Sequence, residues 1–160
     1  MAYAPRTHFR HRAGATKIAA KGQASRHKPQ RGQHPMPGNA RAIVLVEDDD
    51  SSRQAFERVL DAAGFRAESF ASAESLLESD AICRAACMVF DVQLPGLSGF
   101  ELRRQLVRER CAEQPVIFIT GHDEATAREQ AEALGAAAYL TKPFAGRALV
   151  AAVARAVGAG

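Results

Sequence analysis

The chain has 160 residues and a formal net charge of +3, with 47% hydrophobic residues, 24% charged residues and no Trp, which is typical of one globular domain. Its longest apolar runs, residues 42–46 and 116–119, are far shorter than the ~20 residues that cross a bilayer, so no membrane-spanning segment is expected. Three cysteines without a Cys-x-x-Cys pair argue against a disulfide framework or a zinc site. We therefore expect a reducing, cytoplasmic compartment.

The net positive charge comes from the first 40 residues, which hold eight Lys or Arg, four His and no Asp or Glu. They lack helical or strand periodicity, and Gly and Pro crowd their end. We interpret residues 1–40 as a disordered basic tail and residues 41–160 as the folded domain, whose 13 basic and 18 acidic residues leave it a formal charge of −5. Two other interpretations stay open: the tail binds a polyanion such as nucleic acid, or Met36 is the true first residue. An organelle transit peptide is not favoured, because the segment has no apolar helical face.

From residue 41 onward, short apolar runs alternate with segments of helical period, which is the pattern of an α/β domain built on a parallel sheet. Residues 65–70 alternate polar and apolar side chains and so suit a sheet edge. The pattern predicts five strands, each followed by a helix: strands at 42–46, 65–70, 87–90, 116–119 and 137–140, and helices at 51–63, 73–78, 98–110, 124–134 and 144–157. The expected fold is a doubly wound (βα)₅ domain with a five-stranded parallel sheet.

Local signals mark the ends of the expected helices. Gly64 and Gly135 follow the first and fourth helices, where glycine commonly closes the last turn. Ser72 and Asp123 are suited to cap the second and fourth helices, and Ser98 opens a Ser-x-x-Glu capping box for the third.

Polar side chains gather at the carboxyl ends of the expected strands, which is where open α/β sheets bind ligands. Asp48 and Asp49 follow the first strand, and Asp91 ends the third. If these strands are neighbours, ~4.8 Å apart, their carboxylates crowd together and repel one another unless a cation neutralises them. A set of oxygen ligands without Cys or His suits Mg²⁺. Lys142 adds a positive charge, and the Thr120 hydroxyl can donate to an anionic oxygen.

Four motifs at these strand ends carry a resemblance to a known family. They are Val46-Glu47-Asp48-Asp49, the run Asp-Val-Gln-Leu-Pro-Gly-Leu-Ser-Gly at 91–99, Ile-Thr-Gly-His at 119–122 and Leu-Thr-Lys-Pro-Phe at 140–144. Together they resemble a response-regulator receiver domain, and the resemblance covers residues 42–157. The residues of the last two motifs are most similar to those of receivers that precede LuxR-like DNA-binding domains. The family implies a sheet with strand order 2-1-3-4-5.

The resemblance implies a phosphoacceptor site that works with Mg²⁺. Asp91 is similar to the carboxylate that takes a phosphoryl group from a sensor histidine kinase or a histidine phosphotransfer protein. Asp48 and Asp49 resemble the acids that hold Mg²⁺, and Asp91 together with the backbone carbonyl of Gln93 would complete the protein ligands. The metal ion and a lysine would supply the fixed positive charge that phosphoryl transfer needs.

The resemblance also implies a switch. Lys142 would hold a phosphoryl oxygen, and Thr120 would move to bond the phosphate. Tyr139 matches an aromatic residue that swings inward with Thr120 and changes the face formed by the fourth helix, fifth strand and fifth helix. The Lys142-Pro143 peptide is similar to one that is cis in the family.

We therefore expect a stand-alone phosphorylatable receiver, since no LuxR-like output domain follows, which signals to an unknown protein target and has no conventional multiple-turnover activity. The first alternative is a receiver-fold module that binds proteins without phosphorylation. The second is an Mg²⁺-dependent phosphohydrolase that uses Asp91, but residues 91–93 offer no second acid for a leaving group. Nucleic-acid binding would depend on the basic tail, and the oligomeric state is open. Gln93 and His122 flank the site, and we hypothesise that they tune the lifetime of the acyl phosphate.

Overall fold

A computed structural model describes residues 42–109, 113–122 and 125–158 of the chain. The basic tail, with its expected disorder and nucleic-acid binding, lies outside the described residues, as does the expected helix cap Asp123. Among the described residues, no helix is long and apolar enough to span a membrane.

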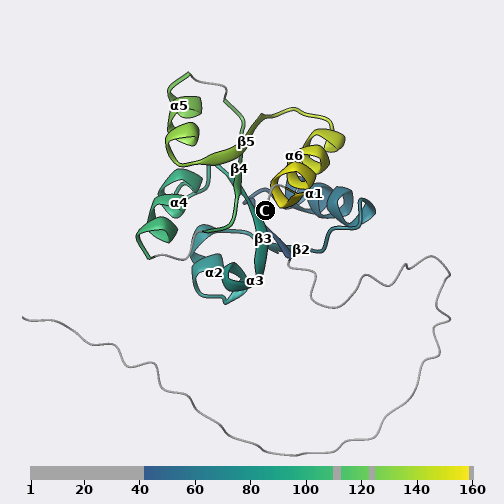
Figure 1. The fold of residues 1–160 in the computed structure, drawn as a ribbon, viewed down its shortest axis with the longest axis horizontal. Coiled ribbons are helices and arrows are strands. Elements are labelled where there is room, and N and C mark those ends of the chain that lie inside the picture. The colour runs from purple at the N-terminus through teal and green to yellow at the C-terminus, as the bar shows by residue number, and fades with distance from the viewer. Residues whose placement is uncertain (1–41, 110–112, 123–124, 159–160) are drawn as a thin grey trace, which may run out of the picture. The chain divides into compact units, whose positions relative to one another are not determined.

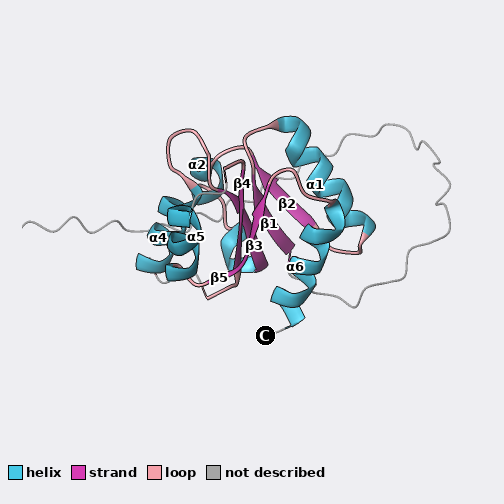
Figure 2. Cartoon of the chain, turned by 90° about the horizontal axis from the view of Figure 1, so that it is seen from above, coloured by secondary structure: helices cyan, strands magenta, loops and turns pink. Residues whose placement is uncertain are grey.

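Among the described residues, the centre of the fold is one sheet of five parallel strands in the order β2-β1-β3-β4-β5. Figure 1 shows the sheet with helices around it, and Figure 2 labels every strand. The strands are β1 Ala42–Val46, β2 Ala67–Phe70, β3 Ala85–Asp91, β4 Val116–Thr120 and β5 Ala136–Thr141. The predicted (βα)₅ fold and the strand order are therefore confirmed. All five strands point the same way, so their carboxyl ends meet at one edge of the sheet.

Helices cover both faces of the sheet. They are α1 Asp50–Ala62, α2 Ala73–Leu77, α3 Ala81–Arg84, α4 Gly99–Arg108, α5 Ala125–Ala133 and α6 Gly146–Gly158. In Figure 2, α1 and α6 lie on one side of the sheet, and α2, α4 and α5 lie on the other. The single turn α3 was not predicted, because four residues are too few to display a helical period.

The three inner strands are buried on both faces, as expected for a parallel sheet between two helical layers. Alternate side chains of each strand enter different cores. In β1, for example, Ile43 and Leu45 pack with Leu60 of α1 and Leu149 of α6. The opposite core is built from the intervening strand residues and the other helices: Val44, Val46, Met88, Phe90, Phe100, Leu102, Leu106 and Phe118. Each fully buried large aliphatic side chain contributes about 1.5–3 kcal/mol, so these two cores hold the strand ends in place.

The predicted turn and cap signals fix where the helices begin and end. Gly64 and Gly135 have φ angles of +87° and +71°, a left-handed conformation that favours glycine, and both follow a helix as predicted. Ser98 caps α4 and forms the predicted capping box with Glu101. Ser72 caps α2, also as predicted. The cap of α4 anchors the loop that follows β3.

Candidate functional site

Four strands deliver polar side chains to the same edge of the sheet. Glu47 directly follows β1, Asp91 is the last residue of β3, Thr120 is the last residue of β4, and Lys142 directly follows β5. Asp91, Thr120 and Lys142 were predicted to meet here, and they lie at the ends of the neighbouring strands β3, β4 and β5. Glu47, Asp91 and Thr120 are buried, at 1%, 4% and 2% exposure, so the site lies at the base of the strand ends rather than on a solvated rim.

Three carboxylates converge at this edge. Oxygen atoms of Glu47, Asp48 and Asp91 all lie within 4.8 Å of one another, and Asp48 alone of the three is exposed. The structure therefore places Asp48 and Asp91 together, as the sequence predicted. Glu47 was not among the predicted ligands. Its position directly after β1 could have identified Glu47 as a site residue, because the backbone at the end of a strand still holds the side chain in the buried layer.

Asp49 has a different task from the one predicted for it. Its side chain caps α1 by accepting a hydrogen bond of 2.7 Å from the backbone N–H of Ser52. That bond lowers the pKa of the Asp49 carboxyl. The residue therefore takes no part in the carboxylate cluster, and the acidic pair beside Asp91 is Glu47 and Asp48 instead of Asp48 and Asp49. The physical reason is that the helix starts at Asp50, which makes Asp49 the first available cap.

Lys142 bridges the two buried acids. Its Nζ donates to Oδ2 of Asp91 at 2.5 Å and to Oε2 of Glu47 at 2.8 Å. Burial raises the pKa of Glu47 and the nearby charge of Asp91 raises it further, while the hydrogen bond from Lys142 opposes both. Burial lowers the pKa of Lys142, but its bonds to Asp91 and Glu47 outweigh that effect and raise the pKa above its ordinary value. The lysine therefore stays charged while it joins β5 to β1 and β3.

Both carboxylate oxygens of Asp91 have fixed partners. Oδ1 accepts from the backbone N–H of Gln93 at 2.6 Å, and Oδ2 accepts from Lys142. The backbone of Asp91 also packs closely against Gly99. A Cβ added to Gly99 would lie 2.3 Å from the Asp91 carbonyl oxygen. Only glycine fits at the start of α4 without moving the end of β3. The carboxylate is thus held in one orientation, as a nucleophile needs to be.

His122 connects the remaining predicted residues. Its backbone carbonyl accepts a hydrogen bond from the Thr120 hydroxyl at 3.0 Å and one from the Tyr139 hydroxyl at 3.5 Å. Its backbone N–H donates to Thr120 Oγ1 at 3.1 Å, and its Nδ1 bonds the Gln93 side-chain amide at 2.7 Å. Sequence reasoning placed Gln93 and His122 beside the site, but the bond between them was not predicted. It ties the loop after β3 to the loop after β4.

Comparison with known proteins identifies the family. The family model for the response regulator receiver domain matches residues 43–154, which includes all four strand-end motifs. The chain belongs to the response-regulator receiver family. This match confirms the receiver resemblance that the sequence motifs indicated. Response regulators are the phosphorylatable components of two-component systems.

Individual relatives agree with this. The receiver is 36% identical over 116 residues to the transcriptional regulatory protein FixJ of Azorhizobium caulinodans, covering 72% of this chain and 54% of FixJ. It is 35% identical to nodulation protein W of Bradyrhizobium diazoefficiens, covering 76% of this chain and 53% of that protein. The chain thus spans about half the length of these curated relatives.

Solved structures give the same fold. The response regulator StyR matches with a TM-score of 0.67 and 35% identity, over 75% of this chain and 61% of StyR. The BeF3-activated DrrB receiver domain matches with a TM-score of 0.66 and 29% identity, over 73% of this chain and 97% of that domain. The chemotaxis protein CheY4 of Vibrio cholerae matches with a TM-score of 0.65 and 28% identity, over 73% of this chain and 99% of CheY4.

The donor set of this receiver fits a hard divalent cation. Glu47, Asp48 and Asp91 bring a formal charge of −3 to one small volume, and Lys142 returns only +1. Carboxylate oxygens, one of them on an exposed side chain that leaves room for water, are the ligands that Mg²⁺ prefers. The contribution of the Gln93 carbonyl stays a prediction. The Lys142-Pro143 peptide is cis, as predicted.

An aromatic pair lies beneath the lysine of this receiver. The rings of Phe56, from α1, and Phe144 stack with their centroids 5.4 Å apart. The Lys142 ammonium lies 5.9 Å from the centroid of Phe56, within the range at which a ring face attracts a cation. Phe56 therefore adds a favourable contact to the same ammonium that bonds the two buried acids.

Proposed function

We propose that Asp91 accepts a phosphoryl group from a phosphohistidine of a sensor histidine kinase or a histidine phosphotransfer protein. The observation that carries the proposal is the fixed Asp91 carboxylate, bonded to Lys142 and lying beside Glu47 and Asp48. An oxygen of Asp91 forms a bond to phosphorus while the bond between phosphorus and the donor imidazole nitrogen breaks, and that nitrogen takes up a proton from solvent. The product is an acyl phosphate on Asp91 and a neutral histidine on the partner.

The neighbouring residues divide the remaining work. Lys142 already contacts Asp91 and would turn its ammonium toward an incoming phosphoryl oxygen, while Glu47 keeps a bond to the same ammonium. Glu47, Asp48 and Asp91 are the residues that would hold Mg²⁺, which when bound supplies positive charge to the phosphoryl oxygens. No further acid is needed for transfer from a phosphohistidine. We accordingly propose a signalling module without conventional multiple-turnover activity.

Phosphorylation would be read through Thr120 and Tyr139. In the structure both hydroxyl groups bond the same backbone carbonyl, that of His122. Thr120 therefore has to leave this carbonyl in order to donate to a phosphoryl oxygen. That change removes the Thr120 bond to this carbonyl and leaves the Tyr139 bond in place, which supports a shift of the surface around β5. We propose that a downstream protein recognises this surface in the phosphorylated receiver.

The experiment is incubation of the full chain with acetyl phosphate and Mg²⁺, followed by the mass of the intact protein. The proposal expects one added phosphoryl group in the parent and none in Asp91→Asn. Asp61→Asn is the matched control, because Asp61 is an exposed aspartate near the other end of α1 and should react like the parent. No incorporation into a folded parent would favour the alternative module that binds proteins without phosphorylation. Continued consumption of phosphomonoesters would favour a hydrolase.

A further inference from the structure

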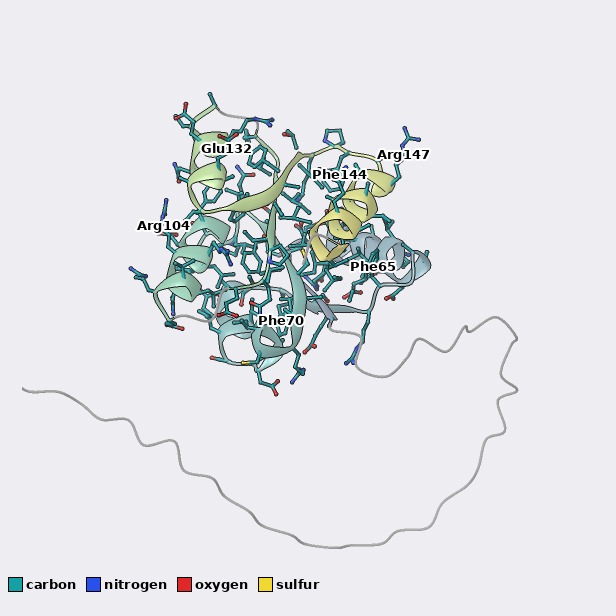
Figure 3. The ribbon with its side chains drawn as sticks, in the orientation of Figure 1. Phe65, Phe70, Arg104, Glu132, Phe144 and Arg147 are labelled. Carbon is teal, nitrogen blue, oxygen red and sulfur yellow. The ribbon has the colours of Figure 1, made fainter. Side chains whose placement is uncertain are left out.

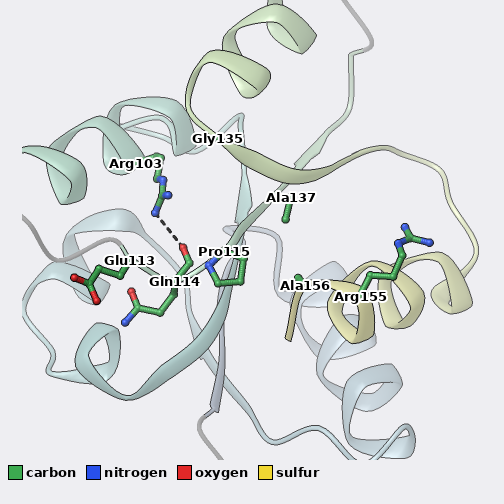
Figure 4. Close-up of a pocket in the computed structure, with 8 residues that line it drawn as sticks. All are labelled: Arg103, Glu113, Gln114, Pro115, Gly135, Ala137, Arg155 and Ala156. Carbon is green, nitrogen blue, oxygen red and sulfur yellow. Dashed lines mark hydrogen bonds between the residues drawn. The ribbon is translucent and has the colours of Figure 1, made fainter. Parts of the chain in front are cut away.

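A cavity lies at the amino ends of β4 and β5, away from the carboxyl-end site. It has a volume of about 580 Å³ and is lined from four parts of the chain (Figure 4). Arg103 comes from α4, Gln114 precedes β4, Ala137 lies in β5 and Arg155 comes from α6. Nothing in the proposed phosphorylation chemistry uses these residues.

Arg103 lines this cavity as a buried charge that has no counter-charge within the part of the chain that the structure describes. The residue is 7% exposed, and among the described residues its guanidinium makes one hydrogen bond, from Nη1 to the backbone carbonyl of Gln114 at 3.3 Å. Its Nε–H is buried without an acceptor, and Oε1 of Gln114 is buried without a donor. No carboxylate among the described residues forms an ion pair with Arg103. Burial lowers the pKa of the guanidinium, as expected for a charge that lacks a partner.

Leaving a guanidinium buried and unpaired is costly, and an anion beside it removes much of that cost. We propose that this cavity binds a small oxyanion, a carboxylate or a phosphate, beside the guanidinium of Arg103. Arg155 lines the cavity from α6 with its guanidinium directed away from Arg103 in Figure 4, and Glu113 is the one acid among the described lining residues. Figure 4 shows the Glu113 carboxylate turned away from Arg103. The planar guanidinium suits the oxygens of either anion.

The test is thermal unfolding of the full chain, without divalent ions, in sodium phosphate or sodium acetate against sodium chloride of equal ionic strength. We expect phosphate, acetate or both to raise the Tm of the parent by roughly 5 °C at about ten times the dissociation constant. In Arg103→Gln the shift should disappear. Arg104→Gln is the matched control, because it removes the same charge from the next residue, which is exposed and bonds Gln130, and it should keep the full shift.

A second variant covers the case in which Arg103→Gln does not fold. Ala137→Leu keeps both arginines but places a larger side chain in the cavity, so it should lose the shift as well. Stabilisation by phosphate alone identifies a phosphate-bearing ligand, and stabilisation by acetate identifies a carboxylate; either result supports the site. No stabilisation of the parent by either anion would overturn the proposal. An undiminished shift in Ala137→Leu or Arg103→Gln would do the same.

Discussion

Replacing Gly99 by alanine tests how tightly the phosphoacceptor is held. A Cβ at this position would lie 2.3 Å from the carbonyl oxygen and 3.0 Å from the carbonyl carbon of Asp91, and both are backbone atoms that cannot rotate away. The start of α4 and the end of β3 have to separate by about 1 Å to restore ordinary contact. Overpacking of this kind costs about 1–3 kcal/mol, which lowers the Tm of a domain of this size by roughly 5–15 °C.

The same displacement should slow phosphorylation. A misplacement of about 1 Å at a reacting group costs on the order of 100-fold in rate, so Gly99→Ala should accept phosphate from acetyl phosphate about that much more slowly. The assays are thermal unfolding by circular dichroism and the rate of phosphoryl incorporation by intact mass. Gly158→Ala is the matched control, since a Cβ there meets nothing within 4 Å. If the two variants behaved alike in both assays, the reasoning about close packing against Asp91 would be refuted.

Three further predictions concern the metal ligands, a buried thiol and the loop after β3. Asp48→Asn removes one charged ligand and should weaken Mg²⁺ binding by about tenfold or more in a metal titration. Asp49→Asn should leave the Mg²⁺ affinity within about twofold of the parent. Equal losses in the two variants would contradict the assignment of Asp49 to the helix cap. Burial raises the pKa of Cys87 from 9.0 to about 12, so the exposed Cys83 should be alkylated at about pH 8 while Cys87 is protected until the domain unfolds. Since the raised pKa favours the protonated thiol in the folded state, that contribution to stability is complete below about pH 9 and declines as the pH rises toward 12. Gln93→Ala breaks the bond between the loops after β3 and β4 and should change the decay rate of the phosphorylated receiver several-fold; an unchanged rate would end the hypothesis that this residue tunes its lifetime.

The fold could be predicted from the sequence because its signals are local and repeated. Continuous apolar runs indicated the three inner strands, and the Ser98 capping box and Gly64 indicated helix ends that the structure confirms. The third strand is longer than predicted, Ala85–Asp91 instead of 87–90, because the two alanines at its start are too small to give a hydrophobic signal. The single turn α3 was not predicted because its four residues are too few to display a helical period.

The site was predicted less completely, because its details depend on single-residue register. The sequence motifs identified Asp91, Lys142 and Thr120 at strand ends, but the boundary between β1 and α1 could not be placed to the residue. An error of one position exchanges Glu47, which is buried at the strand end, for Asp49, which caps the helix. The links through His122 join two loops and an edge strand. Such contacts depend on tertiary structure, and no local pattern encodes them.

One carboxylate, that of Asp91, should carry the phosphoryl group. The direct measurement is borohydride reduction of the receiver after reaction with acetyl phosphate and Mg²⁺, followed by peptide mass mapping, because reduction converts an acyl phosphate into a stable alcohol at the modified residue. Reduction is expected at Asp91, dependent on Mg²⁺, with Asp48 and Glu47 unmodified. Modification of either of those residues in place of Asp91 would contradict this assignment.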